Sequence, residues 1–89
     1  MSKYQPLHDY LTHLPTTTAD VTLRFDEVEH ILGERLPASA SQHRPWWANP
    51  TNKRDHPYAQ AWLAAGWRVD GVDLTRRWVR FRRSGLGAG

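Results

Sequence analysis

The sequence predicts a small α+β domain of winged-helix style, with N-terminal helices and a C-terminal β-hairpin joined to a short third strand. Apolar residues recur at helical spacing through the first third of the chain. Residues 55–83 then read as a helix followed by two alternating segments, the pattern of a hairpin. At 89 residues the chain has the size of one domain, which we expect over residues 1–83, with a disordered tail over residues 84–89.

The N-terminal segment predicts one helix and one strand. Over residues 4–14, one side of a helix is apolar, and Pro15 ends it. The apolar residues are Tyr4, Leu7, Leu11 and Leu14. After a polar connector, residues 21–23 have the length and composition of a short strand that pairs with the hairpin.

Residues 25–32 predict a second helix. Its inward residues are Phe25, Val28, Ile31 and Leu32, and Gly33 stops it in the left-handed conformation. Glu27 is placed to fold back on the start of the helix.

Residues 37–44 predict a third, short helix that opens at Pro37 and ends before Pro45. Two short helices joined by a Gly-containing turn are the outline of a helix-turn-helix, whose second helix enters the DNA major groove. The side chains here that suit base edges or phosphates are Ser39, Ser41, Gln42, His43 and Arg44. Such corners also occur in domains that bind no nucleic acid, so the outline does not decide the function.

Trp46 and Trp47 stand in a segment that we expect to be extended. Adjacent residues of an extended chain point to opposite sides, so one Trp is predicted in the core and the other at or near the surface. A surface Trp beside Arg44, Lys53 and Arg54 could stack on a base or a sugar. The alternative is that it covers the edge of a small core.

The last helix is predicted to start at Pro57, with Asp55 or His56 as its cap, and to end at Gly66. Its apolar face carries Tyr58, Ala61, Trp62 and Ala65. Two aromatic rings on one face require that this face be buried.

The closing hairpin has an apolar face and a basic face. Its inward residues are Trp67, Val69, Val72, Leu74, Val79 and Phe81, and their parity changes around Gly71, where we expect a β-bulge. Residues 74–77 make the turn, and five of the eight residues 76–83 are Arg. The outward residues Arg68, Arg80 and Arg82 suit a wing that lies along a phosphate backbone. The alternative is that they keep the sheet soluble as cross-strand neighbours.

The composition restricts the class of protein. The chain has no Cys, so neither a disulfide framework nor a thiolate metal site is expected. It contains no apolar run of membrane-spanning length and no apolar core of a signal peptide, which predicts a cytoplasmic protein without a membrane partner.

The charge is distributed unevenly along the chain. Residues 1–34 hold two basic and six acidic side chains, a net charge of −4, whereas residues 35–89 hold ten basic and three acidic, a net charge of +7. Such a chain can offer a basic surface to a polyanion, or it can associate with itself head to tail. The charge alone does not choose between the two.

The residues give little support to an enzyme. His43, Asn49, Asn52 and His56 include the residue types of one-metal nucleases, but Pro45 and Pro50 interrupt the segment. No pair of His four residues apart, no Gly-rich phosphate loop and no nucleophile elbow is present, so we expect no metal and no cofactor. The small size also disfavours a catalytic pocket.

Several motifs together match one pattern. An aromatic-led helix ends in Leu-Gly, and Leu-Pro-x-Ser-Ala, a Trp pair with Asn, Ala-Trp-Leu-x-Ala-Gly-Trp and a closing strand follow, over residues 4 to about 83. The positions that carry the pattern are Leu36, Pro37, Ser39, Ala40, Trp46, Trp47, Asn49, Ala61, Trp62, Gly66 and Trp67. In this the chain resembles a family of small bacterial Trp-rich domains without an assigned function. The resemblance implies no activity; Arg24 stands where that family usually has a capping Ser or Thr.

DNA binding is the function that these patterns favour. Residues 37–44 would lie near base edges, with Trp47, Asn49, Lys53 and Arg54 flanking and with Arg68, Arg80 and Arg82 on phosphates. The alternative is a protein-interaction module, such as an antitoxin-like or nuclease-associated adaptor, with an exposed Trp as its anchor. A homodimer would suit the first function, because a single module of this size binds DNA weakly.

Overall fold

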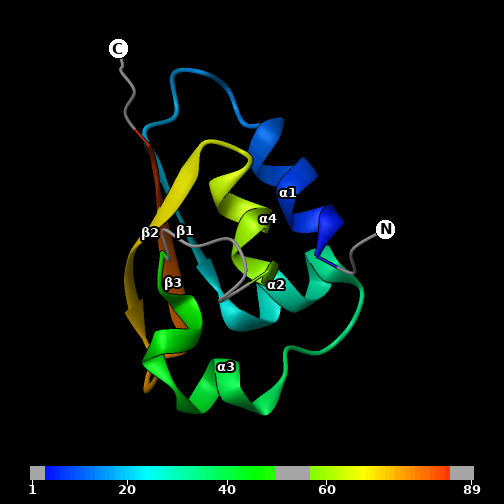
Figure 1. Ribbon diagram of the computed structural model, residues 1–89, viewed down its shortest axis with the longest axis vertical. Helices are drawn as coiled ribbons and strands as arrows, with labels where there is room; N and C mark the ends of the chain where they lie inside the picture. Colours follow the sequence, from blue (N-terminus) through cyan, green and yellow to red (C-terminus); the bar gives the residue numbers. More distant parts are fainter. Residues whose placement is uncertain (1–3, 50–56, 85–89) are drawn as a thin grey trace.

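The computed structural model describes residues 4–49 and 57–84. A three-stranded antiparallel sheet is covered on one side by helices (Figure 1), which confirms the predicted α+β class. The elements are α1 (Gln5–Thr12), β1 (Asp20–Arg24), α2 (Phe25–Leu32), α3 (Ala38–Gln42), the 3-10 helices η1 (Arg44–Trp47) and η2 (Pro57–Ala59), α4 (Gln60–Leu63), β2 (Trp67–Asp73) and β3 (Trp78–Arg83). Among the described residues, no helix has both the length and the apolar character that a membrane span requires. Apart from Ser84, the predicted tail lies outside these residues.

β3 is the central strand of the sheet, because it pairs with both β1 and β2. The predicted short strand is confirmed: β1 runs antiparallel to β3, with Val21 opposite Phe81 and Leu23 opposite Val79. Val79 and Phe81 are fully buried, so they mark the core side of the sheet. Helices α1, α2 and α4 lie on that side (Figure 1).

The hairpin contains the predicted bulge and turn. β2 shifts its register against β3 between Val69 and Gly71. The extra residue lets Val69 and Val72 both face the core, although their numbers differ in parity. The turn occupies residues 74–77, as predicted.

α2 has the predicted bounds and the predicted ends. Phe25 and Val28 are buried, and Gly33 ends the helix with a φ of 78°. The backbone N–H of Arg24 donates to Oε1 of Glu27 over 2.8 Å. Glu27 therefore stabilises the helix start, where the Arg24 side chain has no oxygen to offer as a cap.

α1 and α4 are shorter than predicted. α1 begins one residue later and ends two residues earlier than the predicted helix over residues 4–14. The last helix opens with the 3-10 turn η2, so α4 itself has four residues, and Gly66 follows with the expected left-handed backbone at a φ of 86°. Trp62 is buried, as predicted, whereas the predicted caps Asp55 and His56 lie outside the described residues.

The segment of Trp46 and Trp47 is not extended, contrary to the prediction, but forms η1. α3 ends at Gln42, and Pro45 then stands in the first turn of η1, where its fixed φ suits a new helical turn. Successive side chains of a 3-10 helix are about 120° apart, not about 180° as in a strand, so both rings can point to the core. Trp46 is 8% exposed and Trp47 is 1% exposed. The prediction that one of them lies near the surface is therefore wrong.

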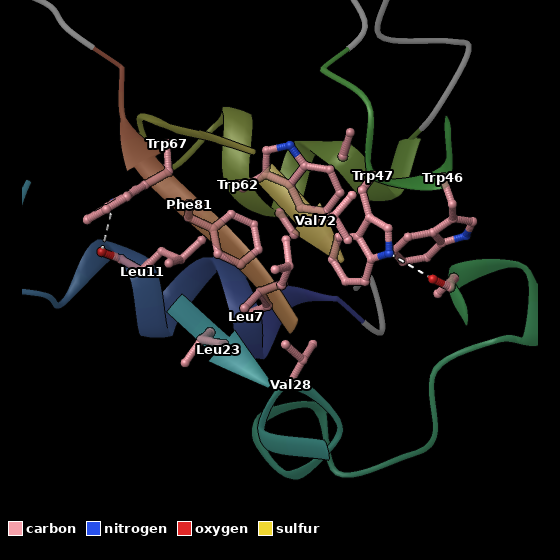
Figure 2. Close-up of a cluster of buried hydrophobic side chains, with 14 of the residues drawn as sticks. Leu7, Leu11, Leu23, Val28, Trp46, Trp47, Trp62, Trp67, Val72 and Phe81 are labelled. Atoms are coloured by element: carbon pink, nitrogen blue, oxygen red, sulfur yellow. Dashed lines mark hydrogen bonds between the residues drawn. The ribbon is translucent and has the colours of Figure 1, made fainter. Parts of the chain in front are cut away.

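Trp47 lies at the centre of an aromatic cluster (Figure 2). Its ring stacks on Phe25 and Trp62, with centroids 5.3 and 5.8 Å away. The Trp46 ring meets the Trp47 ring edge-on, with centroids 4.7 Å apart. The indole N–H of Trp47 donates to the carbonyl oxygen of Ala40 over 2.8 Å. The members of this aromatic cluster are Tyr4, Phe25, Trp46, Trp47, Tyr58, Trp62 and Phe81. Large rings thus supply much of the core of a small domain.

Candidate nucleic-acid interface

The helices lie on one side of the sheet and leave the other side, hereafter the outer face, uncovered by them (Figure 1). The register of the strands places the predicted wing arginines on this outer face. Side chains alternate along a strand, so the neighbours of the buried Val79 and Phe81 point outward. The outer face consists of Asp20, Thr22 and Arg24 on β1, Trp78, Arg80 and Arg82 on β3, and Arg68, Asp70, Gly71 and Asp73 on β2. The three predicted wing residues, Arg68, Arg80 and Arg82, therefore share one surface.

Asp70 binds two of these arginines. Its Oδ2 lies 3.0 Å from Nε of Arg80 and 3.3 Å from Nη2 of Arg82. Desolvation raises the pKa of Asp70, but the hydrogen bond from Arg80 and the charges of both arginines outweigh it and hold the pKa below its ordinary 3.8. One carboxylate cannot neutralise two guanidinium groups, and the Arg80 and Arg82 side chains remain 40% and 51% exposed.

The lowered pKa predicts how Asp70 contributes to stability. A carboxyl whose pKa is depressed by folding stabilises the folded state above its unfolded pKa, and this contribution disappears as the pH falls through the folded pKa. We expect Asp70→Asn to be less stable than the wild type near neutral pH and to approach it below the ordinary pKa of 3.8. Urea unfolding of both proteins across this range measures the difference. A difference that is independent of pH would contradict the ionic role of Asp70.

Two further arginines lie against core rings. The Cζ atom of Arg83 is 4.4 Å from the ring centroid of Trp67, and its guanidinium donates to backbone carbonyls between α1 and β1. The Cζ atom of Arg77 is 5.5 Å from the ring centroid of Phe25. Rings and carbonyl oxygens hold a guanidinium without neutralising it. Both residues therefore keep their positive charge beside the sheet.

α3, the predicted reading helix, lies at one end of the sheet, beside the β2–β3 turn (Figure 1). The hydroxyl of Ser41 accepts a hydrogen bond from Nη1 of Arg77 over 3.4 Å. Ser39, Gln42 and His43 are exposed. α3 has only five residues, and it packs on η1. α3 therefore lies beside the β2–β3 turn, where Ser41 contacts Arg77.

Asn49 and Arg44 cover the free edge of β2. The side-chain amide of Asn49 donates to the carbonyl oxygen of Val69, and Oδ1 accepts from the N–H of Val69, both over 2.8 Å. Asn49 thus pairs with β2 as a neighbouring strand would. Nη1 of Arg44 donates to the carbonyl oxygen of Val72 over 2.8 Å. Since unpaired sheet edges invite pairing with other chains, these contacts give both residues a structural role that the sequence did not indicate.

Trp47 does not belong to a surface site. Its ring is covered by Phe25 and Trp62, and 1% of the residue is exposed, so no base can stack on it. The predicted flanking role of Trp47 is therefore wrong. Lys53 and Arg54, the other predicted flanking residues, lie outside the described residues.

The acidic side chains of the N-terminal half lie mostly on the helices. Asp9 is in α1, and Asp26, Glu27 and Glu29 are in α2. Between these helices and β1 is a shallow depression of about 420 Å³, lined by Tyr10, Leu23, Asp26, Glu27, His30 and Ile31. Within residues 4–49 and 57–84, no three His, Cys, Asp or Glu side chains are grouped to hold a metal. The charge asymmetry along the chain becomes a basic sheet and an acidic helical layer.

Two residues of the outer face were missed as site candidates. Trp78 has the same parity as Arg80 and Arg82, so the hairpin pattern already predicts that it points outward, although it is not among the predicted binding residues. Arg24 lies opposite Trp78 only through the pairing of β1 with β3. No local pattern in the sequence signals that register.

Comparison with known proteins identifies a family. A family model described as a domain of unknown function (DUF7662) matches residues 4–84. This range contains every helix and strand described above. The match confirms the resemblance to a family of small domains without an assigned function. No curated protein and no solved structure matches the chain.

Proposed function

Because the chain belongs to this family of domains of unknown function, we propose a function from its own surface: the protein binds DNA through the outer face of the sheet. Phosphates would contact the guanidinium groups, which bind them with paired hydrogen bonds. The exposed polar side chains of α3 would flank the bound strand at the turn.

The concentration of arginine on one face carries this proposal. The strands contribute Arg24, Arg68, Arg80 and Arg82, and the adjoining turn adds Arg76 and Arg77, of which Arg77 lies against the ring of Phe25. Against these six stand four aspartates: Asp20, Asp70 and Asp73 on the strands, and Asp26 of α2, whose Oδ1 lies 3.6 Å from Nε of Arg24. A surface with such an excess of basic residues attracts a polyanion.

Replacing Arg68 and Arg82 together with Gln tests the phosphate contacts. The two residues lie opposite each other in register, and both are exposed. Their removal leaves the 3.0 Å contact between Arg80 and Asp70 in place. If both contact phosphates, the slope of log K against log salt should become shallower by about 1.4–1.8. Fluorescence anisotropy of a labelled oligonucleotide between about 50 and 200 mM salt measures that slope.

Two variants serve as controls for this test. Arg35 is exposed in the connection between α2 and α3, a segment that lies away from the sheet (Figure 1). Arg35→Gln should therefore leave the slope nearly unchanged. Asp70→Asn frees Arg80 and Arg82 from their shared carboxylate, so it should increase affinity. Absence of binding by the wild type at low salt, or an equal effect of Arg35→Gln, would remove the proposal.

A protein-interaction module remains the second candidate function. Its predicted Trp anchor cannot be Trp47, which is buried. Trp78, which is partly exposed among arginines, suits an acidic partner protein instead. An interaction of this kind would survive nuclease treatment of a cell extract, whereas a DNA-bridged one would not.

A further inference from the structure

We infer that the outer face takes single-stranded DNA, with one base stacked on Trp78. This inference rests on the proposed DNA binding and specifies the form of DNA. It depends on the position of Trp78, on its neighbours along the sheet, and on the lengths of the helices.

Trp78 differs from the other four tryptophans of the chain. Trp46, Trp47, Trp62 and Trp67 are at most 8% exposed. Trp78 is only partly buried, lies outside the aromatic cluster, and stacks on no other ring of the described residues. Its indole N–H makes no hydrogen bond within residues 4–49 and 57–84, and it is not enclosed. Its ring is therefore available to a ligand in a way that the core indoles are not.

The neighbours of Trp78 on the outer face are two arginines, Arg24 and Arg80, and Asp73, which lies opposite it on β2. The Cζ atom of Arg80 lies 5.9 Å from the ring centroid of Trp78. Both side chains approach Gly71 on β2: a Cβ atom there would lie 3.2 Å from Nη2 of Arg80 and 3.9 Å from the Trp78 ring. Arg24 lies opposite Trp78 on β1. A nucleotide on the ring would thus have Arg80 beside it on β3 and Arg24 opposite on β1, where Arg24 would exchange its 3.6 Å ion pair with Asp26 for a phosphate.

The order of residues along β3 suits an extended ligand. Trp78, Arg80 and Arg82 follow one another at alternate positions on the same side of the strand. A nucleic-acid strand that runs along β3 would meet a stacking ring first and two phosphate-binding groups next. Proteins that bind single strands combine these two elements, a basic track and an aromatic ring.

The geometry disfavours double-stranded DNA as the ligand. The bases of a duplex are stacked on one another, so their faces are closed to a surface Trp. Reading through the major groove needs an element that enters it, usually a helix. In the described part of the chain, α1 and α2 lie on the opposite side of the sheet, and α3 has five residues. The sheet therefore offers its ring to an unpaired base.

Replacing Trp78 with Ala tests the inference on the full chain. The probes are fluorescein-labelled oligo(dT) and a hairpin duplex of equal charge, both titrated at low salt. We expect the wild type to prefer oligo(dT), and Trp78→Ala to weaken oligo(dT) binding by about 5- to 100-fold, the loss of one stacked base. Binding of the duplex should change little. Trp78→Phe keeps an aromatic face and should retain most of the affinity, which separates stacking from a structural effect.

The possible results distinguish the two proposals. Preference for oligo(dT) that is lost in Trp78→Ala and restored in Trp78→Phe supports the inference. Equal binding of both probes, or no effect of Trp78→Ala, overturns it while DNA binding through the arginines stands. Absence of binding to either probe overturns both. Far-UV circular dichroism confirms that each variant is folded before titration.

Discussion

Replacement of Trp47 with Ala is expected to lower the free energy of unfolding by about 3–5 kcal/mol. The residue is 1% exposed, and its ring stacks between Phe25 and Trp62. The substitution removes these contacts and leaves the carbonyl oxygen of Ala40 without its donor. A domain of this size has a total stability of about 5–13 kcal/mol, so the variant should be close to unfolding at 37 °C.

Thermal unfolding followed by near-UV circular dichroism measures this effect. We expect a fall in Tm of about 15–30 °C. Trp78→Ala is the matched control, because it removes the same side chain from the outer face, where it should cost less than about 1 kcal/mol. Equal losses at the two positions would contradict the assignment of Trp47 to the centre of the core. Because of its structural effect, Trp47→Ala cannot test a role in binding.

Replacement of Asn49 with Ala is expected to cost about 2 kcal/mol, a fall in Tm of about 8–15 °C. The side chain makes two hydrogen bonds to the backbone of Val69, and its Oδ1 also accepts the indole N–H of Trp62 over 3.1 Å. The Trp62 ring is buried, so water replaces that acceptor poorly. Because of these three hydrogen bonds, we expect a large loss of stability although Asn49 is exposed.

Two further variants define the source of the loss. Asn49→Asp keeps the Oδ1 acceptor but sets a carboxylate oxygen against the carbonyl oxygen of Val69, so it should be destabilised at neutral pH and should recover part of its stability at low pH, where a protonated carboxyl can donate to that carbonyl. Gln42→Ala, at another exposed polar residue, should change stability by less than about 0.5 kcal/mol. If Asn49→Ala were as stable as Gln42→Ala, Asn49 would not secure the edge of β2.

Local patterns predicted the C-terminal part of the fold well. The alternation around Val79 and Phe81, the change of parity at Gly71 and the position of the turn each depend on residues close together in sequence. The conformation of residues 44–47 was predicted wrongly. Pro45 suits the first turn of a helix, and the segment forms the 3-10 helix η1 instead of an extended chain. Because η1 forms there, both Trp46 and Trp47 lie in the core.

The candidate site was predictable to a smaller extent. The outward direction of Arg68, Arg80 and Arg82 follows from strand periodicity alone. The contacts of Arg44 and Asn49 with the edge of β2 join residues 20 or more positions apart, and no local signal indicates them. Polar residue types in a loop suit a ligand and a sheet edge equally well, so only the tertiary structure separates the two roles.

The division of the tryptophans between the core and the sheet surface has a spectroscopic consequence. Trp46, Trp47 and Trp62 lie within 4.7 to 6.4 Å of one another, close enough for their excited states to couple and to give a near-UV signal that reports tertiary packing. Trp78 stands apart from these rings, so its emission responds to solvent and to quenchers. The protein thus contains two separate optical reporters, one for unfolding and one for events at the sheet surface, without any added label.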